Sequence, residues 1–194
     1  AKTRPLALKN SDAKLMAASA NWHLSVVAEQ HVPRTQRGFV RGRNFLDNVW
    51  RLDAQARIAT LDTPEELARR RPCLVSVDVA AAFPSLAWGR LFAALCQLGI
   101  PDCYIHLIRA LYEGQHCWTR IGSRCYYMCL VLTGVAQGCP LSGTLWALAT
   151  APFVEAIAGA LALPSRSLAS RPPRDEPLLG PGRDAEFGVC ADDM

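Results

Sequence analysis

The sequence of 194 residues lacks the features by which several classes of protein are recognised. It has no run of 18 or more apolar residues, so we predict no membrane-spanning helix. Its first residues, Ala1-Lys2-Thr3-Arg4-Pro5, do not form the apolar segment of a secretory signal peptide. It also has no internal repeat, which argues against a repeat architecture. A hydrophobic fraction of 51% with 20% charged residues instead predicts a globular chain.

Cysteine is plentiful, but its spacing is not that of a common metal site. None of the eight cysteines forms a C-x-x-C pair, and several, such as Cys73 and Cys96, lie within apolar runs. We interpret them as buried or inert thiols in a reducing compartment. The alternative is a zinc site, although its spacing matches no common finger. Its candidate ligands are His116, Cys117, Cys125 and Cys129.

Charge is distributed unevenly along the chain. Residues 1–71 carry 13 Lys/Arg against 7 Asp/Glu, whereas residues 72–194 carry 8 against 10. A basic front half followed by clustered carboxylates suits a phosphate-rich partner that lies across a metal site. An ordinary solvated surface would also explain the charge, so this pattern is not sufficient alone.

The local patterns predict a mixed helix and strand protein. We expect helices over 11–30, 45–59, 85–98, 101–112 and 140–163, and a short helix after Thr63. The first helix should pack through Leu15, Met16, Ala20, Trp22 and Val26. We expect a buried strand at 73–79, a hairpin of 116–121 and 125–132 around Gly122-Ser123, and a final strand at 185–190. Residues 31–44 should form a loop, and 164–184 a disordered insertion.

Three short motifs stand out in a fixed order. Asp78 ends an apolar run and precedes Val79-Ala80-Ala81-Ala82-Phe83. The glycine-rich run 134–142 contains Gln137-Gly138-Cys139-Pro140, and the chain closes on Ala191-Asp192-Asp193-Met194. Carboxylates from two distant segments can hold two divalent ions around a transferring phosphoryl group. We therefore predict a two-metal nucleotidyl-transfer site.

Each motif has a plainer interpretation when it is considered alone. Asp78 could cap the following turn, but a carboxylate at the end of a buried strand is usually paired or metal-bound. The Asp192-Asp193 pair could be a solvated acidic turn. The segment around Gln137 could be a simple connection to a helix, although its glycines would let the backbone approach a ligand closely. The order of all three motifs favours the catalytic interpretation.

The three motifs resemble motifs A, B and C of reverse transcriptases from non-LTR (LINE-like) retrotransposons. The front of the chain agrees with this family. Arg4-Pro5-Leu6-Ala7-Leu8 with Asp12 and Lys14 resembles its R-P-I-x-L…D-x-K segment. Gln36-Arg37-Gly38-Phe39-Val40-Arg41-Gly42-Arg43, followed by Asp47-Asn48, resembles its Q-x-G-F-x-x-G-R…D-N segment. The resemblance therefore extends from about residue 3 to residue 194.

The resemblance implies a role for each matching residue. Asp78 and Asp192 would ligate two Mg²⁺ ions, or Mn²⁺ in their place, with support from Asp193 and the backbone carbonyl of Val79. Phe83 falls at the family's aromatic steric gate against a 2′-hydroxyl. Arg4, Gln137 and Gly138 would contact the nucleotide. The charge of Arg37, Arg41 and Arg43 points to template backbone. The expected partners are an RNA template, a DNA primer and a dNTP, with no membrane.

The expected fold is α+β, comprising the fingers and the greater part of the palm of a right-hand polymerase. Residues 1–71 would form the basic fingers-like part and residues 72–194 the partial palm, together one domain. The first residue is not Met and the chain stops after the Asp pair, so we expect a fragment without the thumb. An intracellular, nuclear and cytoplasmic location is expected from the family alone.

Two positions depart from the family pattern. Pro84 stands where a second Asp is usual, and Cys190 stands where an aromatic residue is usual before Ala-Asp-Asp. Three alternatives remain open from the sequence: an RNA-dependent RNA polymerase, a group II intron-type reverse transcriptase, and a catalytically inactive nucleic-acid-binding remnant of a decayed element.

Overall fold

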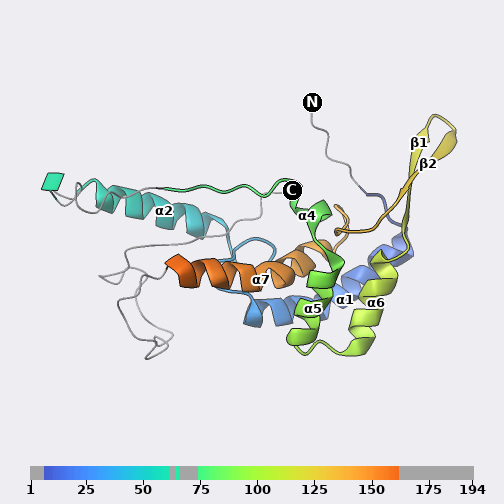
Figure 1. The fold of residues 1–194 in the computed structure, drawn as a ribbon, viewed down its shortest axis with the longest axis horizontal. Helices are drawn as coiled ribbons and strands as arrows, with labels where there is room; N and C mark the ends of the chain where they lie inside the picture. The colour runs from blue at the N-terminus through green and yellow to red at the C-terminus, as the bar shows by residue number, and fades with distance from the viewer. Residues whose placement is uncertain (1–6, 62–63, 66–73, 162–194) are drawn as a thin grey trace.

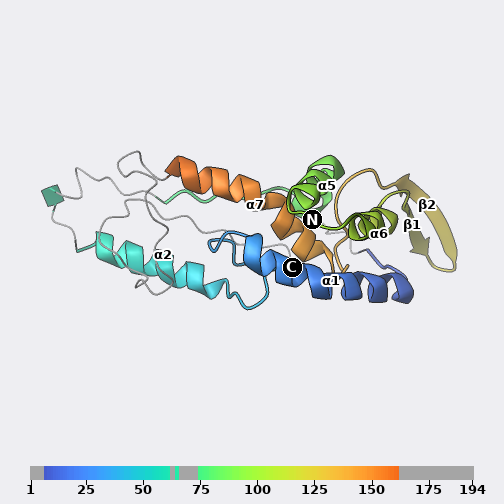
Figure 2. The ribbon, with the colours of Figure 1, turned by 90° about the horizontal axis from the view of Figure 1, so that it is seen from below.

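The computed structural model describes residues 7–61, 64–65 and 74–161. These residues form an elongated set of helices with a β-hairpin at one end (Figures 1 and 2). The helices are α1 (Ser11–His31), α2 (Leu46–Ala59), α4 (Ala82–Ser85), α5 (Trp88–Gln97), α6 (Asp102–Tyr112) and α7 (Ser142–Leu161), and the strands are β1 (His116–Ile121) and β2 (Arg124–Leu130). The mixed composition agrees with the expected α+β class.

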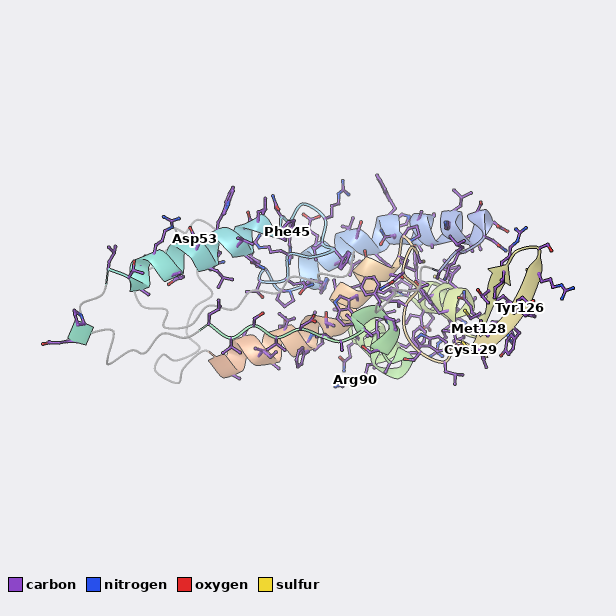
Figure 3. The ribbon with its side chains drawn as sticks, turned by 90° about the horizontal axis from the view of Figure 1, so that it is seen from above. Phe45, Asp53, Arg90, Tyr126, Met128 and Cys129 are labelled. Carbon is purple, nitrogen blue, oxygen red and sulfur yellow. The ribbon has the colours of Figure 1, made fainter. Side chains whose placement is uncertain are left out.

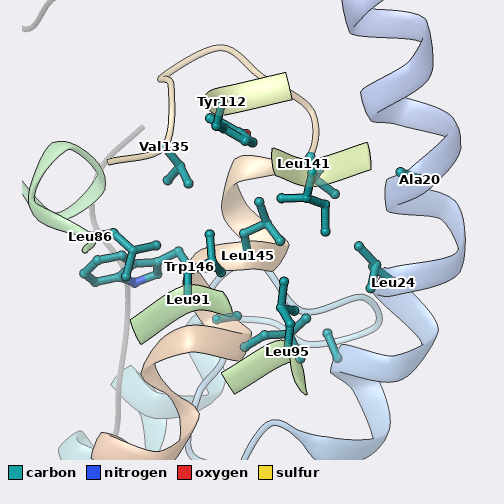
Figure 4. Close-up of a cluster of buried hydrophobic side chains, with 14 of the residues drawn as sticks. Ala20, Leu24, Leu86, Leu91, Leu95, Tyr112, Val135, Leu141, Leu145 and Trp146 are labelled. Atoms are coloured by element: carbon teal, nitrogen blue, oxygen red, sulfur yellow. The ribbon is translucent and has the colours of Figure 1, made fainter. Parts of the chain in front are cut away.

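The core is built around α7, which packs against α5 and α1. Leu141, Leu145 and Leu148 have no exposed surface. Figure 4 shows Leu141 and Leu145 among Leu24 of α1 and Leu91 and Leu95 of α5. By length and composition the segment Ser142–Ala160 could also cross a membrane. Of this segment 39% is buried, and its buried residues lie between Ser142 and Val154, in the part of the helix that packs in the core.

Helix α1 has the predicted bounds to within one residue, but of the five residues predicted to pack, Ala20 alone is buried. Ala17, Ala20, Leu24 and Ala28 are buried, at the three- and four-residue spacing of one helical stripe. The larger residues Leu15, Met16, Trp22 and Val26 are exposed. Because alanine side chains are short, this stripe lets the backbones of packed helices approach closely. Residue size therefore misled the prediction of the buried face.

One hydrophobic core joins residues from both sides of position 71. Ala17, Ala20 and Leu24 belong to the same buried cluster as residues of α5, α6 and α7. Helix α2 lies apart, and within it Asn48 is the buried residue. The proposed parts 1–71 and 72–194 are thus not separate cores among the described residues. The division into a fingers-like part and a partial palm within one domain stays a prediction.

Two predicted elements differ in the structure. The single helix expected over 85–98 is divided into α4 and α5, with Leu86 and Ala87 extended between them. The strand expected at 73–79 is wrong for residues 74–79, which have no ladder partner among the described residues. Instead they run as an extended segment towards α4 (Figure 1), with Leu74, Val75 and Val77 at least 76% exposed. A strand requires a neighbour to satisfy its backbone groups.

The predicted hairpin is confirmed. Strands β1 and β2 pair antiparallel, from Ile121 opposite Arg124 to His116 opposite Leu130. Gly122 has a φ of 61° at the turn, which a residue without a Cβ adopts at low cost. An irregularity between Cys117 and Trp118 shifts the register by one residue. Three further predictions lie outside the described residues: the insertion 164–184, the strand 185–190 and most of the helix expected after Thr63.

Candidate active site

Asp78 lies on the exposed extended segment that leads into α4. Three residues later the chain turns through Ala81, whose φ of 52° and ψ of 50° are in the left-handed region. This conformation costs an alanine free energy, since its Cβ approaches the following carbonyl oxygen. The Ala81 carbonyl accepts the first hydrogen bond of α4, from the Ser85 amide at 2.9 Å. The turn thus fixes the path of the chain directly after the candidate metal ligand.

Helix α4, which follows this turn, is hydrogen-bonded through Phe83 and Leu86 to the start of the Gln-Gly loop. The Val135 amide donates to the Phe83 carbonyl at 2.9 Å, and the Gly134 amide donates to the Leu86 carbonyl at 2.8 Å. The Thr133 hydroxyl donates to the same Leu86 oxygen at 3.0 Å. Two segments about 50 residues apart are therefore held in one arrangement. The structure brings the first and second motifs together.

Gly134 is required at this junction for two reasons. Its φ of 87° is unfavourable for a residue with a Cβ. A Cβ built at this position would lie 2.6 Å from the Pro84 carbonyl oxygen, an atom of the backbone. The indole of Trp88 closes the junction by donating to the Gly134 carbonyl at 2.7 Å. The close approach leaves no space for a side chain.

A buried hydroxyl supports the loop of the second motif from the core side. The Tyr112 hydroxyl lies 2.9 Å from the Ser142 hydroxyl oxygen and donates to the Cys139 sulfur at 3.2 Å. Ser142 in turn donates to the Ala136 carbonyl at 2.8 Å. Burial, with a further contribution from Cys139, raises the pKa of Tyr112 well above its usual range. Tyr112 therefore stays protonated and keeps its hydrogen bonds at physiological pH.

The first described residues of the chain also meet this loop. The Ala7 amide donates to the Gln137 carbonyl at 3.1 Å. Lys9 places its ammonium group 4.1 Å from the centre of the Tyr112 ring and donates to the Leu111 carbonyl at 3.0 Å. Desolvation lowers the pKa of Lys9 from its ordinary value. The segment that resembles the family's first fingers motif is thereby attached to the Gln-Gly loop.

Gln137 and Gly138 lie at the accessible tip of the loop. Gly138 is exposed with a φ of 93°, and Gln137 is partly buried. No side-chain hydrogen bond of Gln137 is seen in the described part of the chain, while its backbone carbonyl is occupied by Ala7. The amide group of Gln137 is therefore available to an incoming molecule.

Phe83 packs in the core rather than on an open surface. Its ring is 5% exposed and lies 5.4 Å from the centre of the Phe39 ring and 5.9 Å from that of Trp146. Phe39 itself contacts Gly143, where a Cβ would lie 2.5 Å from the Phe39 Cδ1. The described contacts give Phe83 a packing role. Its function as a sugar gate stays a prediction.

The three arginines of the front motif have different environments. Arg43 donates to the carbonyls of Pro33, Gln36, Glu29 and Val32, at 2.5 to 3.0 Å. Burial, followed by repulsion from Arg37 and Arg34, lowers the pKa of Arg43. Arg37 forms an ion pair of 3.1 Å with Asp47. Arg41 is exposed and lies over the Trp22 ring, 5.6 Å from its centre. A template contact would have to displace backbone bonds at Arg43, whereas Arg41 is open.

Some of the proposed metal ligands lie within the described residues and others do not. Asp78 and the Val79 carbonyl supply hard oxygen ligands, which suit Mg²⁺. No group of three His, Cys, Asp or Glu side chains that could hold a metal occurs among residues 7–61, 64–65 and 74–161. This argues against the zinc site at His116, Cys117, Cys125 and Cys129. The predicted residues Arg4, Asp192 and Asp193 lie outside the described residues.

The structure also corrects the interpretation of the cysteines and adds residues that the sequence did not reveal. Cys139 is buried, but the other described cysteines, at 96, 103, 117, 125 and 129, are exposed free thiols.

Tyr112, Ser142 and Trp88 support the loop of the second motif, yet none was singled out from the sequence. Ser142 could have been noticed as a polar residue directly after Pro140-Leu141. Tyr112 and Trp88 had no comparable signal.

Comparison with known proteins agrees with the order of the motifs. A family model described as reverse transcriptase (RNA-dependent DNA polymerase) matches residues 1–193. A relative, the Transposon TX1 uncharacterized 149 kDa protein of Xenopus laevis, is 28% identical over 151 residues. The match covers 78% of this chain and 11% of that relative, so the chain spans about a tenth of its length. No solved structure matches the chain. Because the family model extends over nearly every residue, the chain belongs to the reverse transcriptase family.

Proposed function

We propose that this chain is the polymerase core of a non-LTR retrotransposon and that it catalyses RNA-templated DNA synthesis. The family assignment supports the reaction class, and the similarity to a transposon protein supports the mobile-element origin. The substrates would be a dNTP and the 3′-hydroxyl of a DNA primer paired with an RNA template. The described fold would then contain the fingers and part of the palm.

The observation that carries this proposal is the junction of the first two motifs. The hydrogen bonds of Thr133, Gly134 and Val135 to the carbonyls of Phe83 and Leu86 hold the glycine-rich loop against α4, the helix that follows the candidate metal ligand in the chain. A nucleotide-transfer site needs such a fixed relationship, because rate depends on the alignment of the reacting groups. Trp88 and Tyr112 secure the loop on its other sides.

The proposed chemistry assigns the carboxylates to metal binding. Asp78, the Val79 carbonyl and Asp192 would hold two Mg²⁺ ions, and Asp193 would support them. When bound, the ions supply electrostatic stabilisation for the charge that develops as the phosphodiester bond forms and pyrophosphate departs. The chain itself positions the carboxylates and the nucleotide. No covalent enzyme intermediate is required.

Three residues are suited to the nucleotide and the nucleic acid: Gln137, which is partly buried, and Gly138 and Arg41, which are exposed. The side-chain amide of Gln137 can donate and accept hydrogen bonds at a sugar or base edge. The exposed backbone at Gly138 permits close approach. Arg41 offers a guanidinium group that makes no ion pair within the described residues, and it could contact template phosphate. We assign Arg43 to the structure of its loop rather than to the template.

Primer extension on poly(rA)/oligo(dT) with Mg²⁺ tests the proposal. The wild-type chain, a chain extended downstream, and an Asp192→Asn variant of each are compared. We expect incorporation of dTTP that Asp192→Asn abolishes. The matched control is Asp102→Asn in the first turn of α6, which should retain activity. Activity that survives Asp192→Asn would refute the carboxylate assignment, and inactivity of both wild-type chains would favour the inactive remnant.

The sugar-gate prediction needs a milder substitution than alanine. Because Phe83 is buried between two other rings, Phe83→Ala should cost about 3–5 kcal/mol of stability and confuse the result. Phe83→Leu keeps more of the packing while removing the flat ring. We expect a lower preference for dNTP over rNTP in Phe83→Leu. An unchanged preference would remove the gate assignment.

A further inference from the structure

The hairpin of β1 and β2 projects from the end of the molecule, away from the helices (Figures 1 and 3). Every residue of β2 is exposed, and in β1 Thr119 alone is partly covered. A two-stranded hairpin has little stability of its own. Its exposed side chains are not part of the hydrophobic core. Trp118 is 60% exposed and Tyr127 is 51% exposed. Large aromatic groups in such a position require an explanation.

The pairing register gathers the aromatic rings on one face. Trp118 is directly opposite Tyr127, with ring centres 5.3 Å apart in an edge-to-face arrangement. The His116 ring lies 5.7 Å from the Tyr127 ring. Because side chains alternate along a strand, Arg120 shares the face of Trp118. We call this set the aromatic face: His116, Trp118, Arg120 and Tyr127.

The opposite face of the hairpin has a different character. Thr119 pairs with Tyr126, and Ile121 pairs with Arg124. Tyr126 is the aromatic residue on this side, and it is 45% exposed, compared with 51% for Tyr127. The register shift between Cys117 and Trp118 brings Trp118 opposite Tyr127 instead of opposite Met128. The bulge is therefore responsible for the ring cluster.

Charge on the hairpin has a single sign. Residues 115–130 contain Arg120 and Arg124 and no Asp or Glu. Within the longer stretch 114–161, Glu155 is the single acidic residue. Exposed rings beside guanidinium groups, without carboxylates, match a ligand that has flat π-systems and negative charges. Unpaired nucleotides have both features.

We propose that the aromatic face binds single-stranded nucleic acid by stacking bases on Trp118 and Tyr127. Arg120, which shares this face, would contact the adjoining phosphates. A base pair in a duplex cannot expose its face to such rings, so the site should discriminate against double strands. This site lies outside the three motifs of the proposed polymerase centre, and its binding does not depend on catalysis.

Equilibrium binding by fluorescence anisotropy tests the proposal on the full chain. The probes are fluorescein-labelled 15-nucleotide oligo(rU) and oligo(dT), which separate RNA from DNA binding, and a hairpin duplex of mixed sequence. We expect both single strands to bind more tightly than the duplex. Trp118→Ala and Tyr127→Ala should each weaken single-strand binding by at least about fivefold. The double variant should lose more than either.

Tyr126→Ala is the matched control, because it removes a tyrosine of similar exposure from the same strand but the opposite face. It should change affinity by less than about twofold. Since these side chains are exposed, the three single variants and the double variant should keep the wild-type circular dichroism spectrum and Tm. Equal losses in Tyr126→Ala and Tyr127→Ala would overturn the proposal, as would wild-type affinity in the double variant. In that last outcome a protein partner would be the better explanation of the face.

Primer extension with the same variants keeps this inference distinct from the proposed function. If the chain has no polymerase activity but Trp118→Ala lowers single-strand affinity, the aromatic face stands and the polymerase proposal fails. If primer extension depends on Asp192 but Trp118→Ala binds normally, the reverse holds. Photocrosslinking with 5-iodouracil oligonucleotides should place the crosslink on the peptide that contains Trp118 or Tyr127. A crosslink confined to other peptides would also overturn the proposal.

Discussion

The indole nitrogen of Trp88 donates a 2.7 Å hydrogen bond to the backbone carbonyl of Gly134, 46 residues further along the chain. This bond closes a junction in which the Gly134 amide also donates to Leu86. The start of α5 and the glycine-rich loop are therefore held together by two bonds at one residue. The stability of this junction can be tested without any substrate.

Gly134→Ala should strongly destabilise the chain. The added Cβ would meet the Pro84 backbone at 2.6 Å, and the φ of 87° is itself unfavourable for alanine. We expect a loss of about 2–4 kcal/mol, from conformational strain and overpacking together. Urea unfolding measures the change. Gly99→Ala is the control, because Gly99 has a φ of 69° but nothing within 4 Å of its Cβ, so it should show the conformational cost alone. Equal losses would refute the steric explanation.

Arg43→Lys should destabilise the loop between α1 and α2. One guanidinium donates to four carbonyls, of Glu29, Val32, Pro33 and Gln36, and an ammonium group cannot reproduce that fork. We expect a loss of about 2 kcal/mol or more, because buried carbonyls would lose their donors. Thermal unfolding measures it. Arg41→Lys, with an exposed guanidinium, should change the free energy of unfolding by less than about 0.5 kcal/mol. A stable Arg43→Lys variant would contradict the structural role.

Tyr112→Phe should cost about 1–2 kcal/mol at neutral pH, because the hydroxyl is hydrogen-bonded to Ser142 and Cys139. The cost should depend on pH. The folded pKa of Tyr112 is raised, so its contribution to stability is complete below the unfolded pKa of about 10 and declines as pH rises above it. The difference in stability between wild type and variant should therefore shrink between pH 10 and 11. Denaturant unfolding at pH 7, 10 and 11 checks this, and a constant difference would contradict the raised pKa.

Thiol labelling of the native chain should separate Cys139 from the other described cysteines. Cys96, Cys103, Cys117, Cys125 and Cys129 are exposed, whereas Cys139 is buried and accepts the Tyr112 hydrogen bond. Brief treatment with iodoacetamide followed by peptide mass spectrometry should modify the five exposed thiols and spare Cys139. In urea all six should react. Rapid native modification of Cys139 would show that the junction opens readily.

The sequence was most informative where local chemistry decides the structure. Helices α1, α2 and α6 begin and end within two residues of their predicted bounds, and α7 begins within two residues of its predicted start. The hairpin turn was evident from Gly122-Ser123. The motif order also identified the family correctly. The buried stripe of α1 was missed because the contact with α7 uses alanines rather than the larger Leu15 and Trp22. The packing partner, and not the hydrophobicity of α1 itself, decides which face is buried.

In the candidate site too, residues within local motifs could be predicted, whereas residues that act across long sequence separations could not. Asp78, Gln137 and Gly138 could be proposed from their motifs, but the residues that hold them could not. Tyr112 and Trp88 act across 30 and 46 residues of sequence, so no local pattern reveals their hydrogen bonds. Arg43 looked like a phosphate ligand because charge does not show which backbone carbonyls a folded loop presents. Pairing for residues 74–79 is likewise a long-range property, and a Val-rich run alone does not create it.

The exposed run of Leu74, Val75, Ser76, Val77, Asp78 and Val79 also bears on how inactive variants should be made. Short β-prone segments with little charge tend to self-associate, and a single ionised side chain within them acts as a gatekeeper. Asp78 is the only ionisable residue of these six. Replacing Asp78 with alanine or asparagine would remove the charge that opposes self-association together with the proposed metal ligand. Aggregation of the variant could then be mistaken for a catalytic defect. Asp78→Glu, which preserves the charge while displacing the carboxylate, is the safer choice for mutagenesis.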